Sequence, residues 1–414
     1  MSWHVDGELT GQGLDRPYFS THVSSGTDSL LAVTDTMNHR IVLFRGLGGE
    51  VVRILGEGAL RCPMGIVAHP KDRMVVYVVD MGSTRLLKMS LLDGRVMASV
   101  GSHGTGPGEL RSPQGVAVSG RLIFVCDTSN NRVCVFEDSS FMGLNFSHAF
   151  GTKGSAPGEL LGPTGVAVLG ERVFVTERYN HRVSVFDDDG ALVRCIGGHR
   201  SSAPGFFNEP FGVALLPPAG AAGAAEAGEA DGDAAGTRLL VSEYFGRRVQ
   251  VLSVHGVPLQ VVHDFRRITQ TADSFGLGSV SVCGSAAAAG RGRFVVVEPK
   301  AGALHGVSQG ADASLQERCF EALAAQCADL DDFRQLVLEL RAQYVSVAMR
   351  AALPEAAAAA TSAAMHDDSG VRQWPESEGS PSRVGGDGDG IVYAPLYEER
   401  PVIGHWSPDN EERI

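Results

Sequence analysis

The chain has 414 residues and a formal net charge of −13 at pH 7. Residues 1–310 carry 27 Lys and Arg against 29 Asp and Glu, and residues 311–414 carry 8 against 19, so the acidity lies in the C-terminal quarter. An acidic chain argues against nonspecific nucleic-acid binding, which needs a basic surface.

The first three quarters of the chain repeat one sequence pattern. The clearest copy runs from Pro113 to Phe136, where apolar runs at 116–118, 123–125 and 133–136 predict three short strands. The pattern returns as LAVTDTMNHRIVLF, as PMGIVA with VYVVDMGSTRLLKM, as PTGVAV with VFVTERYNHRVSVF, as PFGVAL with LLVSEYFGRRVQVL, and as FVVVEPKAGALHGV. None of these segments shows the 3.6-residue apolar spacing of a helix.

The period of the repeat predicts the fold. Each second strand ends on an acid, and successive acids are 45, 47, 50, 66 and 55 residues apart: Asp35, Asp80, Asp127, Glu177, Glu243 and Glu298. The long interval contains an Ala-, Gly- and acid-rich insert at about 217–236, expected to be a flexible loop between the first two strands of the fifth blade. Copies of this length with about four short strands are typical of propeller blades. We therefore predict an all-β, six-bladed β-propeller over residues 1–310.

The N-terminus is expected to close this ring. Residues 1–16 have the pattern of a strand followed by a linker, because GELTGQGLDRP is similar in rhythm to GTGPGELRSP. A sixth blade without its fourth strand would leave sheet edges open. We therefore predict that Trp3–Val5 form the outermost strand of the sixth blade.

Residues 311–353 change to a helical period. Ser314 and Glu317 form a capping box. Apolar residues then recur at spacings of three and four: Leu315, Cys319, Leu323 and Cys327, followed by Leu330, Phe333, Val337, Leu340, Tyr344 and Val347. We predict amphipathic helices here. The pattern leaves open whether residues 314–353 pack on the side or bottom of the propeller, self-associate or dock on a partner.

Residues 354–414 are predicted to be an acidic, low-complexity, disordered tail. The GGDGDG run at 385–390 is too short and too rich in glycine for an EF-hand loop. Residues 391–406 are more apolar and aromatic than their surroundings. Both a short docking motif and an unstructured tail stay open for them.

The cysteines and the N-terminal sequence indicate in which cellular compartment the protein is expected. The seven cysteines form no Cys-x-x-Cys pair, which argues against a zinc ribbon and a RING finger. An odd number of cysteines, without the apolar core of a secretory signal, favours a reducing compartment. No apolar run approaches the 18 residues of a membrane helix. We expect a cytoplasmic protein that does not contact membranes.

The repeat resembles that of the NHL family. The resemblance is carried by the Pro-x-Gly-Val-Ala-Val strand, the Val-x-Asp-Thr-x-Asn-His-Arg-Val turn and the GTGPGEL linker, and residues 38–40 and 180–182 read Asn-His-Arg. It covers about residues 10–307 and implies a six-bladed propeller. WD40 propellers are the nearest alternative, but the chain contains no Trp-Asp dipeptide.

Acid–arginine pairs recur at a spacing of five residues. A four-residue turn between antiparallel strands brings such ends together, so that the carboxylate faces the guanidinium and accepts N–H groups of the turn. Because the pair occurs in blade after blade, we interpret it as framework, with each partly exposed pair contributing about 0–1 kcal/mol. The pairs are Asp35/Arg40, Asp80/Arg85, Asp127/Arg132, Glu177/Arg182 and Glu243/Arg248.

The sequence offers no catalytic constellation. The peptidyl-hydroxyglycine amidating lyase, whose propeller is similar to NHL propellers, holds zinc through histidines just after the prolines of inner strands. The matching positions here are Met64, Gln114, Thr164 and Phe211. A nucleophile elbow and a phosphate loop are also missing from the sequence. We predict no enzyme activity, no catalytic residue, no metal site and no cofactor, and keep a lyase- or hydrolase-like propeller as a disfavoured alternative.

RNA is the second alternative ligand. Some NHL propellers of tripartite-motif ubiquitin ligases and their relatives bind RNA on a basic face. Without the four acids of the insert, the net charge of residues 1–310 changes from −2 to +2, which is neutral rather than basic. The RING and B-box motifs of those ligases are absent from this sequence. We therefore favour a non-catalytic scaffold that binds a protein or peptide partner.

Two turns and one linker predict where that partner binds. Most turns between second and third strands are small and polar, but those of the fourth and fifth blades, and the linker between them, contain arginine and aromatic residues. These residue types are enriched at binding hot spots, and arginine favours a carboxylate-bearing ligand. The alternative is that Tyr179 and Phe245 pack inward against the next blade. The predicted patch consists of Arg178, Tyr179, His181, Phe206, Tyr244, Phe245 and Arg247.

Overall fold

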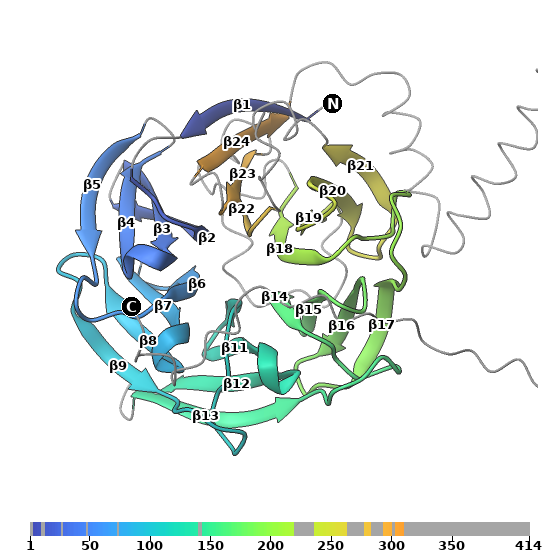
Figure 1. Ribbon diagram of the computed structural model, residues 1–414, viewed down its shortest axis with the longest axis horizontal. Helices are drawn as coiled ribbons and strands as arrows, with labels where there is room; N and C mark the ends of the chain where they lie inside the picture. The colour runs from blue at the N-terminus through green and yellow to red at the C-terminus, as the bar shows by residue number, and fades with distance from the viewer. Residues whose placement is uncertain are drawn as a thin grey trace, which may run out of the picture. The chain divides into compact units, whose positions relative to one another are not determined.

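Six four-stranded antiparallel sheets are arranged around a central axis in the computed structural model (Figure 1). The structure describes residues 3–9, 13–25, 28–46, 49–72, 74–139, 143–218, 236–262, 277–282, 293–299 and 303–309. The all-β, six-bladed propeller is therefore confirmed. The helices predicted at 311–353, the tail at 354–414 and most of the insert lie outside the described residues. No helix within the described ranges is long and apolar enough to cross a membrane.

The strands follow the chain blade by blade. Blades 1 to 3 contain β2 (Pro17–Ser25), β3 (Asp28–Asp35), β4 (Arg40–Arg45) and β5 (Glu50–Leu55); β6 (Pro63–Ala68), β7 (Val75–Asp80), β8 (Arg85–Ser90) and β9 (Val96–Val100); and β10 (Val116–Ser119), β11 (Leu122–Asp127), β12 (Arg132–Ser139) and β13 (Gly143–Phe150). Blades 4 and 5 contain β14 (Pro163–Leu169), β15 (Arg172–Glu177), β16 (Arg182–Asp187) and β17 (Leu192–Gly197); and β18 (Pro210–Leu216), β19 (Arg238–Glu243), β20 (Arg248–Ser253) and β21 (Pro258–Val262). Short 3₁₀ turns, η1 (Thr36–Asn38), η2 (Met81–Ser83) and η3 (Thr128–Asn130), join the second and third strands of blades 1 to 3.

The sixth blade combines both ends of the repeat region. It contains β22 (Val280–Val282), β23 (Arg293–Glu298), β24 (Ala303–Gln309) and, outermost, β1 (Trp3–Leu9). β1 runs antiparallel to β24, with Trp3 opposite Gln309 and Leu9 opposite Leu304 (Figure 1). The predicted closure of the ring is confirmed, and the closing strand is longer than the Trp3–Val5 expected.

The innermost strands are β2, β6, β10, β14, β18 and β22, and the glycine of the Pro-x-Gly motif explains how closely they approach one another. A Cβ atom on Gly65 would collide with the carbonyl oxygen of Gln114 in the next blade, and one on Gly115 with that of Thr164. Gly65 N–H donates to the Gln114 carbonyl oxygen at 2.9 Å. Glycine is therefore required where one backbone contacts the next near the axis.

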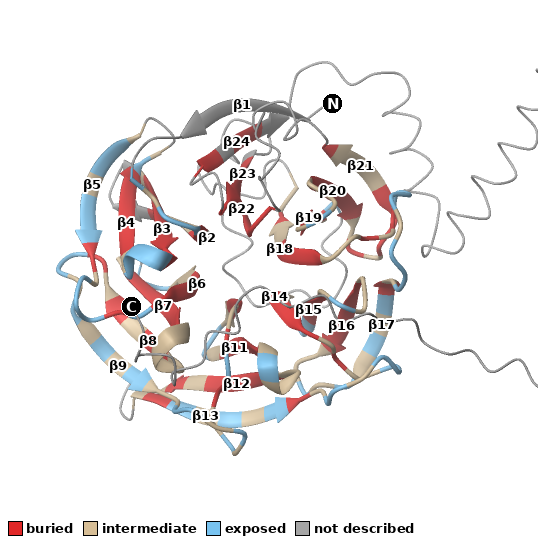
Figure 2. Ribbon diagram, in the orientation of Figure 1, coloured by how far each residue is buried: buried red, intermediate tan, exposed pale blue. Residues whose placement is uncertain are grey.

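The core lies between the sheets rather than within one of them. Tyr77 and Val79 of blade 2, for example, share a core cluster with Ile123 and Phe136 of blade 3. Strands buried on both faces read as continuous apolar runs, which is the pattern seen in the sequence. The middle strands are mostly buried, and exposure increases toward the outermost strands (Figure 2).

Two faces can be told apart from the strand pairing. The first residue of an inner strand lies opposite the acid that ends the second strand, as Pro63 lies opposite Asp80 and Pro210 opposite Glu243. One face carries these residues together with the linkers between blades and the turns between second and third strands. We call it the turn face. The other face carries the remaining turns, including the ends of the insert between β18 and β19, as expected.

Candidate functional site

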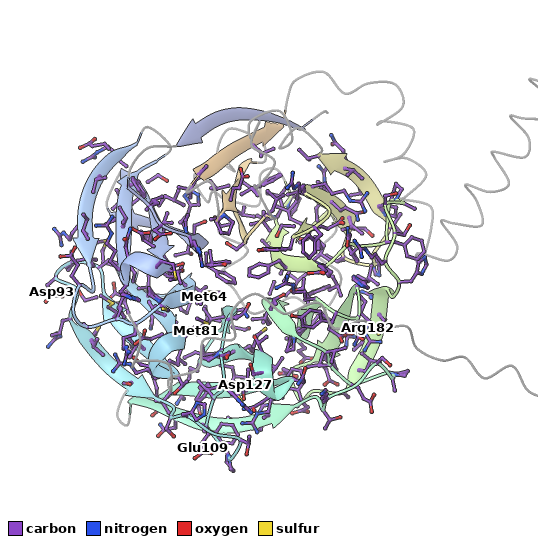
Figure 3. All side chains as sticks on the ribbon, in the orientation of Figure 1. Met64, Met81, Asp93, Glu109, Asp127 and Arg182 are labelled. Atoms are coloured by element: carbon purple, nitrogen blue, oxygen red, sulfur yellow. The ribbon has the colours of Figure 1, made fainter. Side chains whose placement is uncertain are left out.

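The acid at the end of each second strand organises the turn face. Asp127 is fully buried, and its Oδ2 atom accepts hydrogen bonds from Arg132 Nε and Asn130 Nδ2, both at 2.8 Å (Figure 3). Its Oδ1 atom accepts the backbone N–H of Arg111, in the preceding linker, at 2.6 Å. One carboxylate therefore holds the turn, the third strand and the linker together.

The equivalent contact forms in blades 1, 2, 4 and 5. Each carboxylate is fully buried, whereas the arginine side chains are 5–30% exposed, so the pairs are partly exposed on the arginine side, as expected. A buried carboxylate that loses its partner keeps an uncompensated charge, so truncating either of the two most buried arginines, Arg182 or Arg248, should cost about 3–5 kcal/mol, and truncating a more exposed one should cost less. The nitrogen–oxygen distances are 2.7 Å for Arg40–Asp35, 2.9 Å for Arg85–Asp80, 2.6 Å for Arg182–Glu177 and 2.6 Å for Arg248–Glu243.

His181 has a role in joining two blades. It occupies the left-handed position that ends its turn, and its Nδ1 atom accepts the backbone N–H of Glu209, in the next linker, at 3.2 Å. His39 Nδ1 accepts Cys62 N–H at 2.9 Å in the same way, and Asn131 Oδ1 accepts Gly162 N–H at 3.0 Å. Burial lowers the pKa of His181 below its ordinary 6.5, which favours the neutral ring that such an acceptor needs.

Four of the predicted patch residues form one group on the turn face, which we call the Arg178 cluster: Arg178, Tyr179, Tyr244 and Phe245. The guanidinium carbon of Arg178 lies 4.5 Å from the ring centroid of Tyr244, 5.5 Å from that of Tyr179 and 6.0 Å from that of Phe245. Arg178 Nε donates to Glu209 Oε2 at 2.6 Å. Tyr179 is 53% exposed and Phe245 41%, so the alternative of inward packing is wrong for both rings.

The cluster continues toward the axis through two rings that the sequence analysis did not place in the patch. Phe211 lies 6.0 Å from Tyr244, and Tyr18 stacks on Phe211 at 5.9 Å between centroids. Both residues directly follow the proline at the start of an inner strand. Burial raises the pKa of the Tyr18 phenol above its ordinary 10.0. The proline before Tyr18 was the available signal, but without a following glycine this copy of the motif is incomplete.

Phe206 and Arg247, the other two predicted patch residues, lie in the linker before blade 5 and in the turn of blade 5. Phe206 replaces a glutamate whose carboxylate holds the linker in earlier copies, where Glu109 Oε2 accepts Gly106 N–H at 2.8 Å. Here the side chain of Gln250 accepts Gly205 N–H at 2.9 Å and donates to the Phe206 carbonyl oxygen at 2.6 Å. The Phe206 ring contacts the His199 ring in a tilted arrangement, with 3.9 Å between centroids and 41° between the ring planes. Arg247 holds the left-handed position that His181 holds in blade 4.

Met64, Gln114, Thr164 and Phe211 stand after the inner-strand prolines, and Thr164 Oγ1 is hydrogen-bonded to Thr176 Oγ1 at 3.1 Å. Within the described ranges, no three or more His, Cys, Asp or Glu residues form a group that could hold a metal ion.

The NHL repeat family matches the chain at residues 110–136 and 160–186. These segments run from the linker to the third strand of blades 3 and 4 and include two of the acid–arginine turns. The chain is an NHL-repeat β-propeller. No curated protein sequence matches it.

Solved structures match this chain at low sequence identity. A streptogramin B lyase is 13% identical over 72% of this chain and 80% of its own, with a TM-score of 0.44. Hydrazine synthase of Kuenenia stuttgartiensis is 13% identical over 72% and 97%, with a TM-score of 0.47. BBS1N, in complex with ARL6DN, is 14% identical over 73% and 80%, with a TM-score of 0.43.

Proposed function

We propose that this NHL propeller is a non-catalytic scaffold that binds a protein or peptide partner on its turn face through the Arg178 cluster. The observation that carries the proposal is that Arg178, fixed by its ion pair with Glu209, lies beside the exposed rings of Tyr179 and Phe245. Arg178 is only 24% exposed, whereas Tyr179 and Phe245 beside it are 53% and 41% exposed. Exposed aromatic residues that gather around an arginine are typical of binding hot spots.

The geometry of Arg178 favours an acidic ligand. Within the described residues only its Nε donates a hydrogen bond, to Glu209, so the two Nη groups are available to a carboxylate. The rings beside it offer apolar contact to whatever residue adjoins that carboxylate. We therefore expect the partner to present an Asp or Glu, or a chain terminus, next to apolar residues.

The absence of catalysis is part of the proposal and is supported by the residue types. A nucleophile needs a general base within hydrogen-bond reach. The Arg178 cluster consists of arginine, tyrosine and phenylalanine, and the axis positions beside it contribute Phe211 and Tyr18. These side chains bind and orient a ligand but do not form a nucleophile–base pair.

The proposal predicts which variants lose the partner. Peptides selected from a displayed library on the full-length protein should contain an acid beside apolar residues. Changing Tyr179→Ala and Phe245→Ala together should weaken their binding at least about 30-fold, because truncating a hot-spot residue costs at least about 1 kcal/mol and 1.4 kcal/mol is tenfold. Met37→Ala is the matched control, since Met37 is 41% exposed on the turn face of blade 1 and should leave affinity unchanged.

Calorimetry on the purified variants measures the affinities, and thermal melting checks that the fold is retained. Equal affinity of the double variant and the wild-type protein would contradict the proposal. Salt-dependent RNA binding that the double variant loses, with no peptide selected, would favour the RNA alternative instead.

A further inference from the structure

Two tyrosine hydroxyls lie at the axial end of the Arg178 cluster. Tyr244 and Tyr18 both contact the ring of Phe211, with centroid distances of 6.0 and 5.9 Å. Within the described residues, neither hydroxyl has a hydrogen-bond partner. Both can therefore donate a hydrogen bond to a ligand.

Blade 6 leaves room for these rings to meet. β22 lies between β18 and β2 next to the axis (Figure 1). The position that Phe211 and Tyr18 occupy in blades 5 and 1 is taken in blade 6 by Gly278, two residues before Val280 of β22. A Cβ atom on Gly278 would lie 2.8 Å from the carbonyl oxygen of Tyr18. Because blade 6 contributes no side chain here, Phe211 reaches across it to Tyr18.

Two guanidinium groups approach the same phenol. The charges of Arg16 and Arg178 both act on Tyr18, where they partly offset the rise in the phenol pKa that burial and Tyr244 cause. Arg178 belongs to the turn of blade 4 and lies 4.5 Å from the ring centroid of Tyr244, whereas Arg16 belongs to the linker before blade 1. Donor groups from blades 1, 4 and 5 therefore gather at one place.

The backbone around Arg16 is fixed by the framework of the turn face. Arg16 directly precedes β2 and adopts the left-handed conformation, with φ of 48°, as Glu209 does before β18 with φ of 54°. The neighbouring Asp15 donates its backbone N–H to the buried carboxylate of Asp35 at 2.6 Å. The side chain of Arg16 is exposed and forms no ion pair within the described ranges. Its charge is therefore available to a ligand.

We propose that Arg16, Tyr18, Arg178 and Tyr244 form one anion-binding site, the axial anion site, which takes a single carboxylate of the peptide partner. The proposal rests on the partner-binding role of the Arg178 cluster and names the chemical group that this surface selects. Two guanidinium groups and two hydroxyls donate hydrogen bonds here, and a carboxylate has about four sites that accept them.

The charge of the site favours a carboxylate over a phosphate. Arg178 is paired with Glu209 at 2.6 Å, so the two arginines and this glutamate sum to +1. One carboxylate neutralises that charge. A phosphate monoester carries about −1.5 to −2 at pH 7 and would leave negative charge uncompensated beside Glu209. The site therefore selects an Asp, a Glu or a chain terminus rather than a phosphorylated residue.

Fluorescence anisotropy of the full-length protein with a labelled synthetic peptide, of the sequence selected from the displayed library, tests the site. Arg16→Gln and Tyr18→Phe should each weaken binding at least about tenfold, because each removes a hydrogen bond to an ionised group. Two matched controls should leave the affinity unchanged. Arg95→Gln removes an exposed arginine between β8 and β9, on the other face, and Tyr179→Phe removes a hydroxyl from an exposed ring. Thermal melting checks the fold of each variant.

Altered peptides identify which carboxylate is bound. One peptide carries an amide in place of its acidic side chain, and a second carries an amide at its C-terminus. The peptide that has lost the bound carboxylate should bind equally well to the wild-type protein and to Arg16→Gln, because no charge pair is left to break. A third peptide, with phosphoserine in place of the acid, should bind no more tightly than the aspartate form.

The outcomes separate this site from the proposed function. If either Arg16→Gln or Tyr18→Phe binds like the wild-type protein while the Tyr179→Ala, Phe245→Ala double variant does not, the axial anion site is excluded and the proposed function stands. The site is also excluded if both amide peptides stay sensitive to Arg16→Gln, or if the phosphoserine peptide binds more tightly. If the library yields no peptide, the proposed function fails and the axial anion site fails with it.

Discussion

At the scale of single residues, the sequence repeat predicted the acids at the ends of the second strands. It did not predict a further buried carboxylate, that of Asp138. Asp138 lies outside the acid–arginine spacing, yet its Oδ2 atom accepts Tyr77 Oη and Lys88 Nζ, each at 2.6 Å. His69 Nε2 is 3.6 Å from the same oxygen. The group joins blade 2 to blade 3. Sequence spacing could not predict it, because these residues meet only when two blades pack.

This network predicts the effect of Tyr77→Phe. Tyr77 is 1% exposed, so removing its hydroxyl deprives a nearly buried carboxylate of a donor and should cost about 1–3 kcal/mol at pH 7. Urea unfolding measures the change. Tyr179→Phe is the control, because its exposed ring should change stability by less than about 0.5 kcal/mol. Equal stability of the two variants would mean that the hydrogen bond to Asp138 contributes nothing.

The same network predicts a pH dependence. Burial by itself raises the pKa of the Asp138 carboxyl, but hydrogen bonds from Lys88 and Tyr77 outweigh it, so the pKa lies below the ordinary 3.8. A pKa lowered by folding adds stability that is complete above 3.8 and is lost as the pH falls through the folded value. The stability difference between wild-type protein and Asp138→Asn should therefore narrow as the pH falls from 5 toward 3 in urea titrations. A constant difference over this range would contradict the ionised network.

At the scale of the element, the turn between second and third strands explains why the Asn-His-Arg motif recurs. The residue before the arginine adopts a left-handed conformation in every complete copy, with φ of 55° at His39, 49° at Thr84 and 55° at Asn131. Asparagine and histidine adopt this region more readily than β-branched residues. Their side chains also accept a hydrogen bond from a backbone N–H of the next linker. The motif therefore satisfies both a backbone conformation and a contact between blades. The repeat showed the turn but not this contact, because its partner lies about thirty residues away, as from Asn131 to Gly162.

Thr84 is the β-branched residue among these left-handed positions, and it predicts a stabilising change. Threonine pays a steric cost at φ 49°, and Thr84→Asn should relieve it and offer an acceptor to the N–H of Ser112, as Asn131 does for Gly162. We expect a gain of about 0.5–1 kcal/mol, seen as a higher melting temperature. The reverse exchange, Asn131→Thr, is the matched control and should lower stability by at least as much. A loss of stability in Thr84→Asn would show that the left-handed turn does not limit this blade.

At the scale of the whole molecule, the period of the repeat predicted the number of blades, and the linker-like stretch near the N-terminus predicted the closing strand. The contacts around the axis needed the structure. Blade order follows from the chain, so the neighbouring positions of blades 4 and 5 could be inferred. The line of rings from Tyr18 to Phe211 and Tyr244 crosses from blade 1 to blade 5, past blade 6. Only closure of the ring brings the first and fifth blades together, and no local pattern contains that contact.

Closure itself predicts what happens when β1 is removed. Without residues 1–9, β24 becomes an edge strand, although Leu304 and Val307 on it are now fully buried. Exposing that edge should lower the melting temperature by about 10 °C. Several kcal/mol of strand pairing and apolar burial are lost, and each kcal/mol lowers the melting temperature by about 2–4 °C. An open edge also pairs with other chains, so the truncated protein should associate as its concentration rises. Differential scanning calorimetry and light scattering measure the two effects, and deletion of residues 354–414 is the control that should show neither. A truncated protein that melts like the full chain and stays monomeric would mean that the ring holds without its closing strand.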